Sequence, residues 1–139
     1  MKIAIDLDDV LASFAPEFLR WYNDKYQTNW QYADFADYHW PNWMNISVEQ
    51  AIQDVHNFFE TKEFANLPVM PGAQEFIQDL VKEHELHIVT SRQFAIKDVT
   101  HKWLKNNFPD YFQSVSFGNS YSLDGSPALT KGELCKQAG

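Results

Sequence analysis

Short apolar runs alternate along this chain with longer stretches of helical periodicity. The runs at residues 2–7, 86–90 and 114–117 are too short for helices and contain β-branched residues, which is typical of strands buried in a sheet. Four other stretches repeat apolar residues at intervals of three and four, the spacing that places them on one face of a helix. These stripes are Phe14, Phe18, Trp21 and Tyr22; Val48, Ile52, Val55 and Phe59; Ala73, Phe76, Ile77, Leu80 and Val81; and Ile96, Val99, Trp103 and Leu104.

The order of these elements predicts the fold class. Strands that alternate with helices favour an α/β architecture with a parallel sheet and helices on both of its faces. Residues 2–7 are almost continuously apolar, so we expect them to form a buried strand of that sheet. Residues 14–67 are too many for a simple crossover, and we expect them to form a helical insertion in a core made of residues 1–13 and 68–139.

Two segments carry the side-chain pattern of a helix start. Ser47 with Gln50, and Thr130 with Glu133, have the spacing of a capping box, in which each side chain bonds the backbone of the other residue. We therefore expect helices to begin directly after Ser47 and Thr130. Within the last helix, we expect the single cysteine of the chain, Cys135, to belong to the core.

Composition narrows the classes of partner. The chain has 11 Lys and Arg residues against 19 Asp and Glu residues, a formal net charge of −8, so it lacks the basic surface that duplex nucleic acid requires. No apolar run approaches the roughly 18 residues of a membrane span, and we expect no membrane partner. One cysteine excludes an internal disulfide framework, and the short apolar start is unlike a secretory signal. We therefore expect a cytoplasmic protein that binds small molecules.

Carboxylates gather where the first predicted strand ends. Ligands of open parallel sheets bind beyond the carboxyl ends of the strands, and Asp6, Asp8 and Asp9 lie at such an end. Three carboxylates within four residues repel one another unless a cation offsets the repulsion. Mg²⁺ prefers hard oxygen ligands and binds through one or two carboxylates while it keeps sites for phosphate, so this cluster predicts a magnesium site.

Two further sites with phosphate-binding chemistry follow the later strands. Thr90, Ser91 and Arg92 offer two hydroxyls, backbone N–H groups and a guanidinium at the end of the second strand. Lys131 would be the first residue of the last helix, where the helix dipole disfavours a cation by about 0.3–1 kcal/mol. An anion held by Lys131 and the helix start would offset that cost. These residues are candidates for a phosphate site; the alternative is an ordinary turn with an exposed Arg92 and a surface Lys131 that points to water.

In these motifs the sequence resembles the haloacid dehalogenase-like (HAD) superfamily. Residues 6–10, Asp-Leu-Asp-Asp-Val, match the first motif of that superfamily, and residues 88–91, Ile-Val-Thr-Ser, match the second. Lys131 matches the third motif, a lysine at a helix start. The closest likeness is to the 5′(3′)-deoxyribonucleotidase-like members, whose first motif often continues as Val-Leu-Ala, as residues 10–12 do here.

The resemblance implies a fold and a reaction. It implies a Rossmann-like sheet with a small helical cap inserted after the first strand, and a Mg²⁺-dependent phosphatase of small phosphomonoesters, most plausibly a nucleotidase. Asp6 would be the nucleophile that forms an aspartyl-phosphate, and Asp8 would be the general acid and then the base. The Asp6 carboxylate and the Asp8 carbonyl would hold Mg²⁺, while Thr90 and Lys131 would bind the phosphoryl oxygens.

One motif of the superfamily is missing. The resemblance calls for a fourth motif, an acidic pair after a further strand, and only eight residues follow Lys131. We therefore expect a C-terminally truncated member with weak or absent phosphatase activity. A missing strand beside residues 2–7 would leave an exposed sheet edge, which favours pairing with a second copy of the chain as a homodimer.

Substrate contacts are expected from aromatic residues and one amide. Phe14, Trp40 and Trp43 lie in the predicted insertion, where one or two aromatic rings could stack on a nucleobase, although most such rings pack in a core. Asn119, after the third strand, is a further candidate for orienting substrate. The alternative to an enzyme is a non-catalytic module that binds phosphate or a nucleotide.

Overall fold

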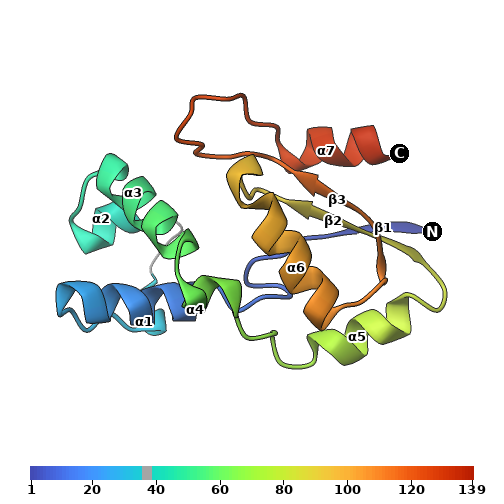
Figure 1. Cartoon of the computed structure of the whole chain (residues 1–139), viewed down its shortest axis with the longest axis horizontal. Helices are drawn as coiled ribbons and strands as arrows, with labels where there is room; N and C mark the ends of the chain where they lie inside the picture. The colour runs from blue at the N-terminus through green and yellow to red at the C-terminus, as the bar shows by residue number, and fades with distance from the viewer. Residues whose placement is uncertain (36–38) are drawn as a thin grey trace. The chain divides into compact units, whose positions relative to one another are not determined.

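The chain divides into two compact units. The computed structural model describes residues 1–35 and 39–139; one unit comprises Met1–Ala12 and Pro68–Gly139, and the other comprises Ser13–Leu67. The first unit contains the whole sheet, and the second is helical, as the colours of Figure 1 allow the reader to follow. We refer to them as the sheet unit and the helical unit and describe each by itself.

Three parallel strands form the sheet unit. They are β1 (Lys2–Ile5), β2 (Glu85–Thr90) and β3 (Phe112–Phe117), and they pair in the order β1-β2-β3. The helices of this unit are α5 (Ala73–Leu80), α6 (Lys97–Asn107) and α7 (Lys131–Ala138), with a 3₁₀ turn, η2 (Phe94–Ile96), before α6. In Figure 1, α6 lies in front of the sheet, and α7 packs against β2. The expected α/β fold with a parallel sheet is confirmed.

The first strand differs from its prediction in burial. β1 pairs only with β2, so it lies at one edge of the sheet that the described residues form. Its residues alternate between exposed and half-buried, and Ala4 is exposed, so the expectation of a buried strand was wrong. An apolar run is equally compatible with an edge strand that covers the core on one face only. The homodimer expected through this edge stays a prediction.

A small, fully apolar core holds the sheet unit together. Leu7, Leu86 and Ile88 from the sheet and Ile77 from α5 are all 0 % exposed. Burying such a side chain contributes roughly 1.5–3 kcal/mol relative to leaving it in water. These residues come from the apolar runs and from the α5 stripe, so the periodicity of the sequence accounts for the packing.

Aromatic packing dominates the helical unit. Its elements are α1 (Ala15–Tyr26), η1 (Tyr32–Asp34), α2 (Trp40–Met44), α3 (Val48–Phe59) and α4 (Lys62–Ala65). Phe18 and Phe58 are almost completely buried, and the Phe18 ring lies 4.7 Å from that of Trp40. Aromatic pairs at such separations add about 0.5–1.5 kcal/mol each beyond the area they bury.

A buried carboxylate ties α1 to α3 in the helical unit. Asp54 is 1 % exposed and accepts hydrogen bonds from the Tyr26 hydroxyl at 2.6 Å and the Gln50 amide at 3.1 Å, and Lys25 lies 3.5 Å away. The hydrogen bond to Asp54 raises the pKa of Tyr26 because it binds the protonated phenol. Removal of Tyr26 or Lys25 would leave a buried charge short of partners, which is costly.

Both predicted helix starts are present. The Ser47 hydroxyl accepts the Gln50 N–H at 3.1 Å, and Thr130 and Glu133 bond each other's backbone N–H groups in a capping box. The expectation for Cys135 was wrong, because its side chain is exposed while its neighbour Leu134 is buried. A helix of two turns has room for few core positions, and Leu134 occupies the one that faces the sheet unit's interior.

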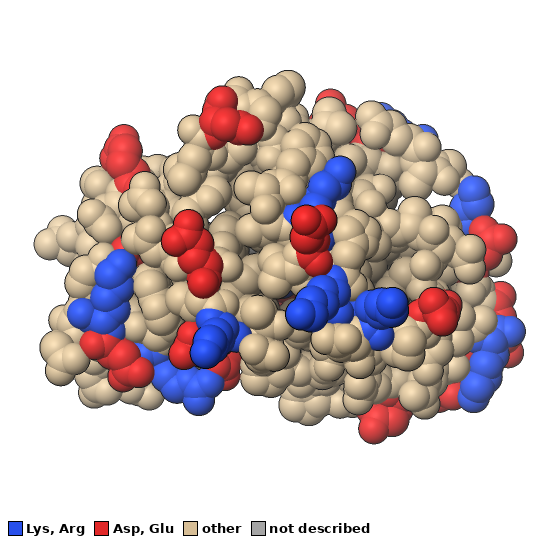
Figure 2. All heavy atoms as spheres, in the orientation of Figure 1, with Lys and Arg blue, Asp and Glu red and all other residues tan. Residues whose placement is uncertain are grey.

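Charges of opposite sign lie close together on the surface. Figure 2 shows Lys and Arg side chains beside Asp and Glu side chains on the face in view. Among the described residues, no helix is both long and apolar enough to cross a membrane.

Three backbone segments approach one another closely where β3 ends. The Gly118 N–H donates to the Thr90 carbonyl at 2.7 Å, and the Gly118 carbonyl accepts the Leu129 N–H, also at 2.7 Å. A Cβ atom at Gly118 would lie 2.8 Å from the Leu129 carbonyl oxygen and 3.2 Å from that of Thr90. Only glycine allows these three backbone segments to approach so closely.

Replacing this glycine should destabilise the protein. We expect Gly118→Ala to lower the free energy of unfolding by about 1–3 kcal/mol, because the new methyl group meets backbone atoms that have little freedom to move. Gly132→Ala is the matched control: it lies in the first turn of α7, and a Cβ there would meet only the Thr130 hydroxyl at 4.0 Å, an ordinary contact. Chemical denaturation of both variants measures the difference, and equal stabilities would contradict the argument.

Candidate active site

A tight loop after β1 carries the first two candidate residues. The Leu7 carbonyl accepts the N–H groups of Leu11 and Ala12 at 2.9 and 3.0 Å, so the chain turns back directly after the strand. This turn leaves the Asp6 and Asp8 side chains 34 % and 29 % exposed, while Leu7 between them is fully buried. Alternation along the backbone thus sends one apolar side chain into the core and two carboxylates to the rim of the sheet.

Asp6 forms an ion pair with Lys131. The Lys131 ammonium donates to Asp6 Oδ2, and the Leu7 N–H donates to Asp6 Oδ1 at 2.8 Å. The two ion-pair partners come from opposite ends of the sequence. A cation at the start of α7 is disfavoured by the helix dipole, and the Asp6 carboxylate supplies the anion that offsets this cost.

This ion pair lies at the edge of the sheet where the parallel strands end. Leu129 is joined through Gly118 to the end of β3, whereas Asp6 follows β1, and β2 lies between those two strands. Lys131 contacts Asp6 just after β1, and Thr90 ends the neighbouring parallel strand β2 at the same edge of the sheet. The expected convergence of Asp6, Thr90 and Lys131 on one rim of the sheet is what this topology produces.

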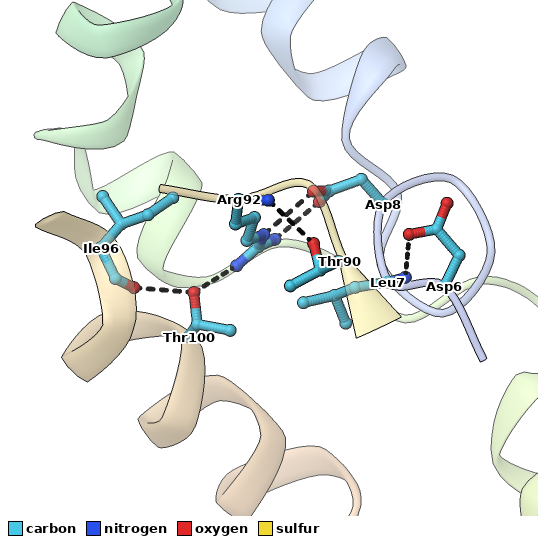
Figure 3. A network of polar contacts seen from close by, with 7 residues as sticks. All are labelled: Asp6, Leu7, Asp8, Thr90, Arg92, Ile96 and Thr100. Carbon is cyan, nitrogen blue, oxygen red and sulfur yellow. Dashed lines mark hydrogen bonds and ion pairs between the residues drawn. The ribbon is translucent and has the colours of Figure 1, made fainter. Parts of the chain in front are cut away.

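Asp8 belongs to a second polar network, which Figure 3 shows. Arg92 grips its carboxylate with two hydrogen bonds, from Nε to Oδ2 at 3.0 Å and from Nη2 to Oδ1 at 2.7 Å. The remaining arm of the guanidinium, Nη1, donates to the Thr100 hydroxyl at 2.9 Å. The Arg92 side chain is only 4 % exposed, so this bidentate pair is shielded from water on the arginine side.

The turn after β2 places a hydroxyl and backbone groups at the same rim. The Thr90 hydroxyl, 1 % exposed, accepts the Arg92 N–H at 3.2 Å, while Ser91 is exposed. Backbone bonds join this turn to the one after β3, because the Ser91 carbonyl accepts the Ser120 N–H at 3.0 Å. Ser91 is therefore held in place by its backbone and presents its side chain to solvent.

Asn119 holds a loop together. Its side-chain oxygen accepts the Phe94 N–H at 3.1 Å, and its amide nitrogen donates to the Ser126 hydroxyl at 2.8 Å and the Pro127 carbonyl at 3.2 Å. The residue is 2 % exposed and these bonds stabilise the loop, while its role in orienting substrate stays a prediction. In the same loop, the Ser126 hydroxyl and N–H lower the pKa of Asp124 by bonding its carboxylate.

The aromatic substrate candidates all lie in the helical unit. Phe14 is buried against Phe18 and Phe58, with ring centroids 6.0 and 5.6 Å away. Trp40 and Trp43 are half-buried, and the Trp43 ring lies 5.1 Å from that of Phe35. These rings pack mainly on one another, and the stacking role proposed for Phe14, Trp40 and Trp43 stays a prediction.

Sequence reasoning missed two residues on which this rim depends. Thr100 lies in the apolar stripe of α6, four residues after Ile96, and a polar residue at a core-facing helix position was the signal that could have identified it. Gly118 carried a weaker signal, a single glycine directly after a predicted strand. Neither signal identifies which residues Thr100 and Gly118 contact. The contacts of Thr100 depend on the tertiary fold, and those of Gly118 depend on how the strands pair.

The oxygen atoms for a metal come from the first loop. Within the described residues there is no group of three or more His, Cys, Asp and Glu side chains that could hold an ion. The Asp6 carboxylate and the Asp8 backbone carbonyl supply two hard oxygens. This donor set fits Mg²⁺, which usually takes one or two carboxylates and fills its remaining positions with water and phosphate oxygens.

A family model matches the part of the chain that contains most of these residues. It covers residues 1–119, and it describes the family as 5′ nucleotidase, deoxy (pyrimidine), cytosolic type C protein. The chain belongs to this family. The match confirms the resemblance to HAD-like phosphatases and nucleotidases that the motifs around Asp6 and Thr90 suggested.

A relative and a solved structure agree with this membership. The chain is 25% identical over 122 residues to a 5′(3′)-deoxyribonucleotidase of Clostridium acetobutylicum, a match that covers 87% of this chain and 67% of that protein. It shares its fold with a haloacid dehalogenase-like family hydrolase of Streptococcus pneumoniae at a TM-score of 0.68 and 17% identity, over 99% of this chain and 67% of that one.

The capping box of α7 should determine the stability of the helix that carries Lys131. We expect Thr130→Ala to lower the free energy of unfolding by about 0.5–2 kcal/mol at pH 7, because the variant loses the hydroxyl that accepts the Glu133 N–H. Thr130→Ser keeps a hydroxyl and is the matched control. Denaturation curves of the three proteins measure the effect, and equal losses in both variants would contradict it.

The same cap predicts a pH dependence. The Thr130 N–H and hydroxyl hold the pKa of Glu133 below its ordinary value of 4.5. A lowered folded-state pKa stabilises the fold above the ordinary value, and this contribution is lost as the pH falls through the lowered one. The stability gap between wild type and Thr130→Ala should therefore narrow in acid.

Proposed function

We propose that the chain carries the site of a hydrolase of small phosphomonoesters, nucleotides among them, which acts through an aspartyl-phosphate on Asp6; the weak or absent activity expected without the fourth motif stays a prediction. The observation that carries the proposal is the ion pair of Lys131 with Asp6 at the carboxyl end of β1, the edge of the parallel sheet at which the neighbouring strand β2 ends with Thr90. A phosphoryl group that approaches Asp6 meets a cation, a hydroxyl and backbone N–H groups from three separate elements. Family membership supports the same chemistry.

Asp6 is suited to nucleophilic attack because its carboxylate is accessible and held in place. Its side chain is 34 % exposed, and the Leu7 N–H fixes one oxygen at 2.8 Å. In the first step, which requires Asp8 in its protonated form, an Asp6 oxygen bonds to phosphorus, the ester bond breaks, and Asp8 gives its proton to the leaving oxygen. In the second step water attacks phosphorus, its proton passes to Asp8, and the Asp6 carboxylate is restored as orthophosphate leaves.

Phosphate binding is assigned to residues that surround Asp6. Lys131 neutralises charge on the phosphoryl oxygens, and the Thr90 and Ser91 hydroxyls donate to them. Such donors are fixed before the reaction begins, so little reorganisation is needed when charge develops in the transition state. Arg92, which the sequence placed in this group, is engaged with Asp8 instead and is considered separately below.

Mg²⁺ is the cofactor that fits the donor set. The Asp6 carboxylate and the Asp8 carbonyl would hold it, and when bound it would neutralise negative charge on the phosphoryl group. Asp6 is also the partner of Lys131, so the two cations would share one carboxylate. This sharing offsets the repulsion between Asp6 and the incoming phosphate.

The substrate class rests on the relatives. The family is described as a deoxy (pyrimidine) 5′-nucleotidase, and the relative from Clostridium acetobutylicum is a 5′(3′)-deoxyribonucleotidase. We infer a nucleoside monophosphate as substrate for this chain as well. Phe14, Trp40 and Trp43 remain the candidates for stacking on the base. Alanine variants of Trp40 and Trp43 are more informative than one of Phe14, because these two rings are only half-buried.

Removal of the nucleophile separates an enzyme from a binding module. We expect Asp6→Asn to reduce hydrolysis of a deoxyribonucleoside monophosphate by at least about 10³-fold, because the covalent step is lost. Binding of inorganic phosphate, measured by calorimetry, should persist, since the variant keeps Lys131 and Thr90 and loses a negative charge. Asp9→Asn, the same change three residues later at an exposed position, is the control and should retain activity.

The outcomes of that experiment are distinct. Equal turnover in wild type and Asp6→Asn would contradict the assignment of the nucleophile. Phosphate binding without any turnover by the wild-type protein would favour the alternative, a non-catalytic phosphate- or nucleotide-binding module.

Metal removal tests the cofactor. We expect a chelator to abolish turnover and added Mg²⁺ to restore it, because two protein oxygens leave most of the coordination sphere to water and phosphate and the ion is easily lost. Assays across a range of Mg²⁺ concentrations measure the dependence, with Na⁺ at equal ionic strength as the control. Full activity in the presence of chelator would show that Lys131 alone supplies the positive charge.

A further inference from the structure

We propose that Arg92 is a positioning residue for Asp8 and does not bind the phosphoryl group. Its guanidinium would hold the Asp8 carboxylate where it exchanges protons with the leaving oxygen and with water. This inference rests on the proposed function, in which Asp8 is the general acid and base. It changes the role that the sequence suggested for Arg92.

Arg92 contacts Asp8 through two parallel hydrogen bonds, not through a single charge-to-charge contact. Arg92 Nε and Nη2 each face a different oxygen of Asp8, at 3.0 and 2.7 Å. A bidentate pair of this kind fixes the plane of the carboxylate as well as its position. Figure 3 shows the guanidinium directed toward Asp8, while the Asp6 carboxylate lies on the far side of Asp8 from it.

The third arm of the guanidinium is anchored by a hydroxyl of fixed orientation. Thr100, which is completely buried, donates its hydroxyl proton to the Ile96 carbonyl at 2.7 Å. Its lone pairs are therefore the groups left to accept from Arg92 Nη1, at 2.9 Å. This arrangement determines the direction of the Thr100 hydroxyl, and that direction in turn determines where the guanidinium lies.

The backbone of Arg92 is held at both ends. Its N–H donates to the Thr90 hydroxyl at 3.2 Å, and its carbonyl accepts the Asn119 N–H at 3.0 Å. The three guanidinium nitrogens of Arg92 already donate, Nε and Nη2 to Asp8 and Nη1 to Thr100, so the side chain is engaged away from a phosphoryl group at the rim. Asp8, 29 % exposed, is the member of this pair that faces the solvent from which substrate arrives.

A positioning role has a kinetic signature. General acid–base catalysis contributes about 10²–10⁴-fold, and a misplacement of about 1 Å can remove roughly 10²-fold of the rate. Loss of a phosphate ligand instead weakens the binding of substrate and of inorganic phosphate. If Arg92 positions Asp8, its substitution should lower kcat. If Arg92 binds phosphate, its substitution should raise KM and the inhibition constant of phosphate.

The experiment measures hydrolysis of p-nitrophenyl phosphate, with inorganic phosphate as the competitive inhibitor, for full-length wild type and variants. We expect Arg92→Lys, which keeps the charge and loses the fork, to reduce kcat about 10²-fold while KM and the phosphate inhibition constant stay within about threefold. Thr100→Val should reduce kcat in the same direction by a smaller factor. Thr100→Ser, which keeps the hydroxyl, is its matched control and should stay within about twofold of wild type.

A double variant tests whether Arg92 acts through Asp8. If it does, Arg92→Lys should cost nothing further in an Asp8→Asn background, since the group that it positions is already disabled. Multiplicative losses in the double variant would overturn the proposal. Circular dichroism and thermal midpoints check folding, and if Arg92→Lys fails to fold, the Thr100 pair decides the question.

The remaining outcomes distinguish this inference from the proposed function. A phosphate inhibition constant raised tenfold or more with kcat retained would make Arg92 a phosphate ligand and overturn the inference. If the wild type turns over substrate and Arg92→Lys has the same kcat, the inference about Arg92 is overturned and the proposed function is not. Absence of turnover in the wild type would overturn the proposed function and this inference with it.

Discussion

The close approach of three backbone segments at Gly118 is the constraint on which the candidate site depends. Gly118 bonds to Thr90 on one side and to Leu129 on the other, so the end of β2, the end of β3 and the start of α7 are joined by main-chain hydrogen bonds. Backbone bonds between buried groups have few alternatives, because an unpaired group there is costly. Thr90 and Lys131 therefore acquire their positions from main-chain geometry rather than from their own side-chain contacts.

Charge in the site is balanced in two separate pairs. Asp6 with Lys131 lies at the open rim, where both partners are exposed enough for water and ions to screen them, whereas Asp8 with Arg92 is shielded on the arginine side. An incoming phosphoryl group can recruit Lys131 from the first pair without leaving a buried charge unpaired. Recruiting Arg92 from the second pair would cost more free energy, because it would leave a desolvated guanidinium or carboxylate without its partner. The roles proposed for Lys131 and Arg92 are consistent with this difference in burial.

Sequence reasoning succeeded where the signal was local. Apolar runs predicted the three strands, and residue spacing predicted the cap at Thr130, because these features depend on neighbours within a few positions. It could not assign Arg92, since a guanidinium after a strand fits a phosphate and a carboxylate equally well. Only tertiary placement brings Arg92 to Asp8 and Thr100. The apolar run of β1 suggested a buried strand for a similar reason, because such a run does not report how many strands will pair with it; the edge position was expected only from the missing fourth motif.

The connections to the helical unit leave the sheet unit at a single point. The Met70 N–H donates to the Leu11 carbonyl at 2.8 Å, and Ala12 pairs with Val69 in an antiparallel bridge, so the outgoing and returning chains are tied together before Ser13 and after Leu67. These contacts within the sheet unit's backbone hold the two ends of the helical unit, residues 13 and 67, next to each other. Insertions, deletions or wholesale exchange of the intervening helices would then leave the loop that carries Asp6 and Asp8 unchanged, so the two units could vary independently in evolution.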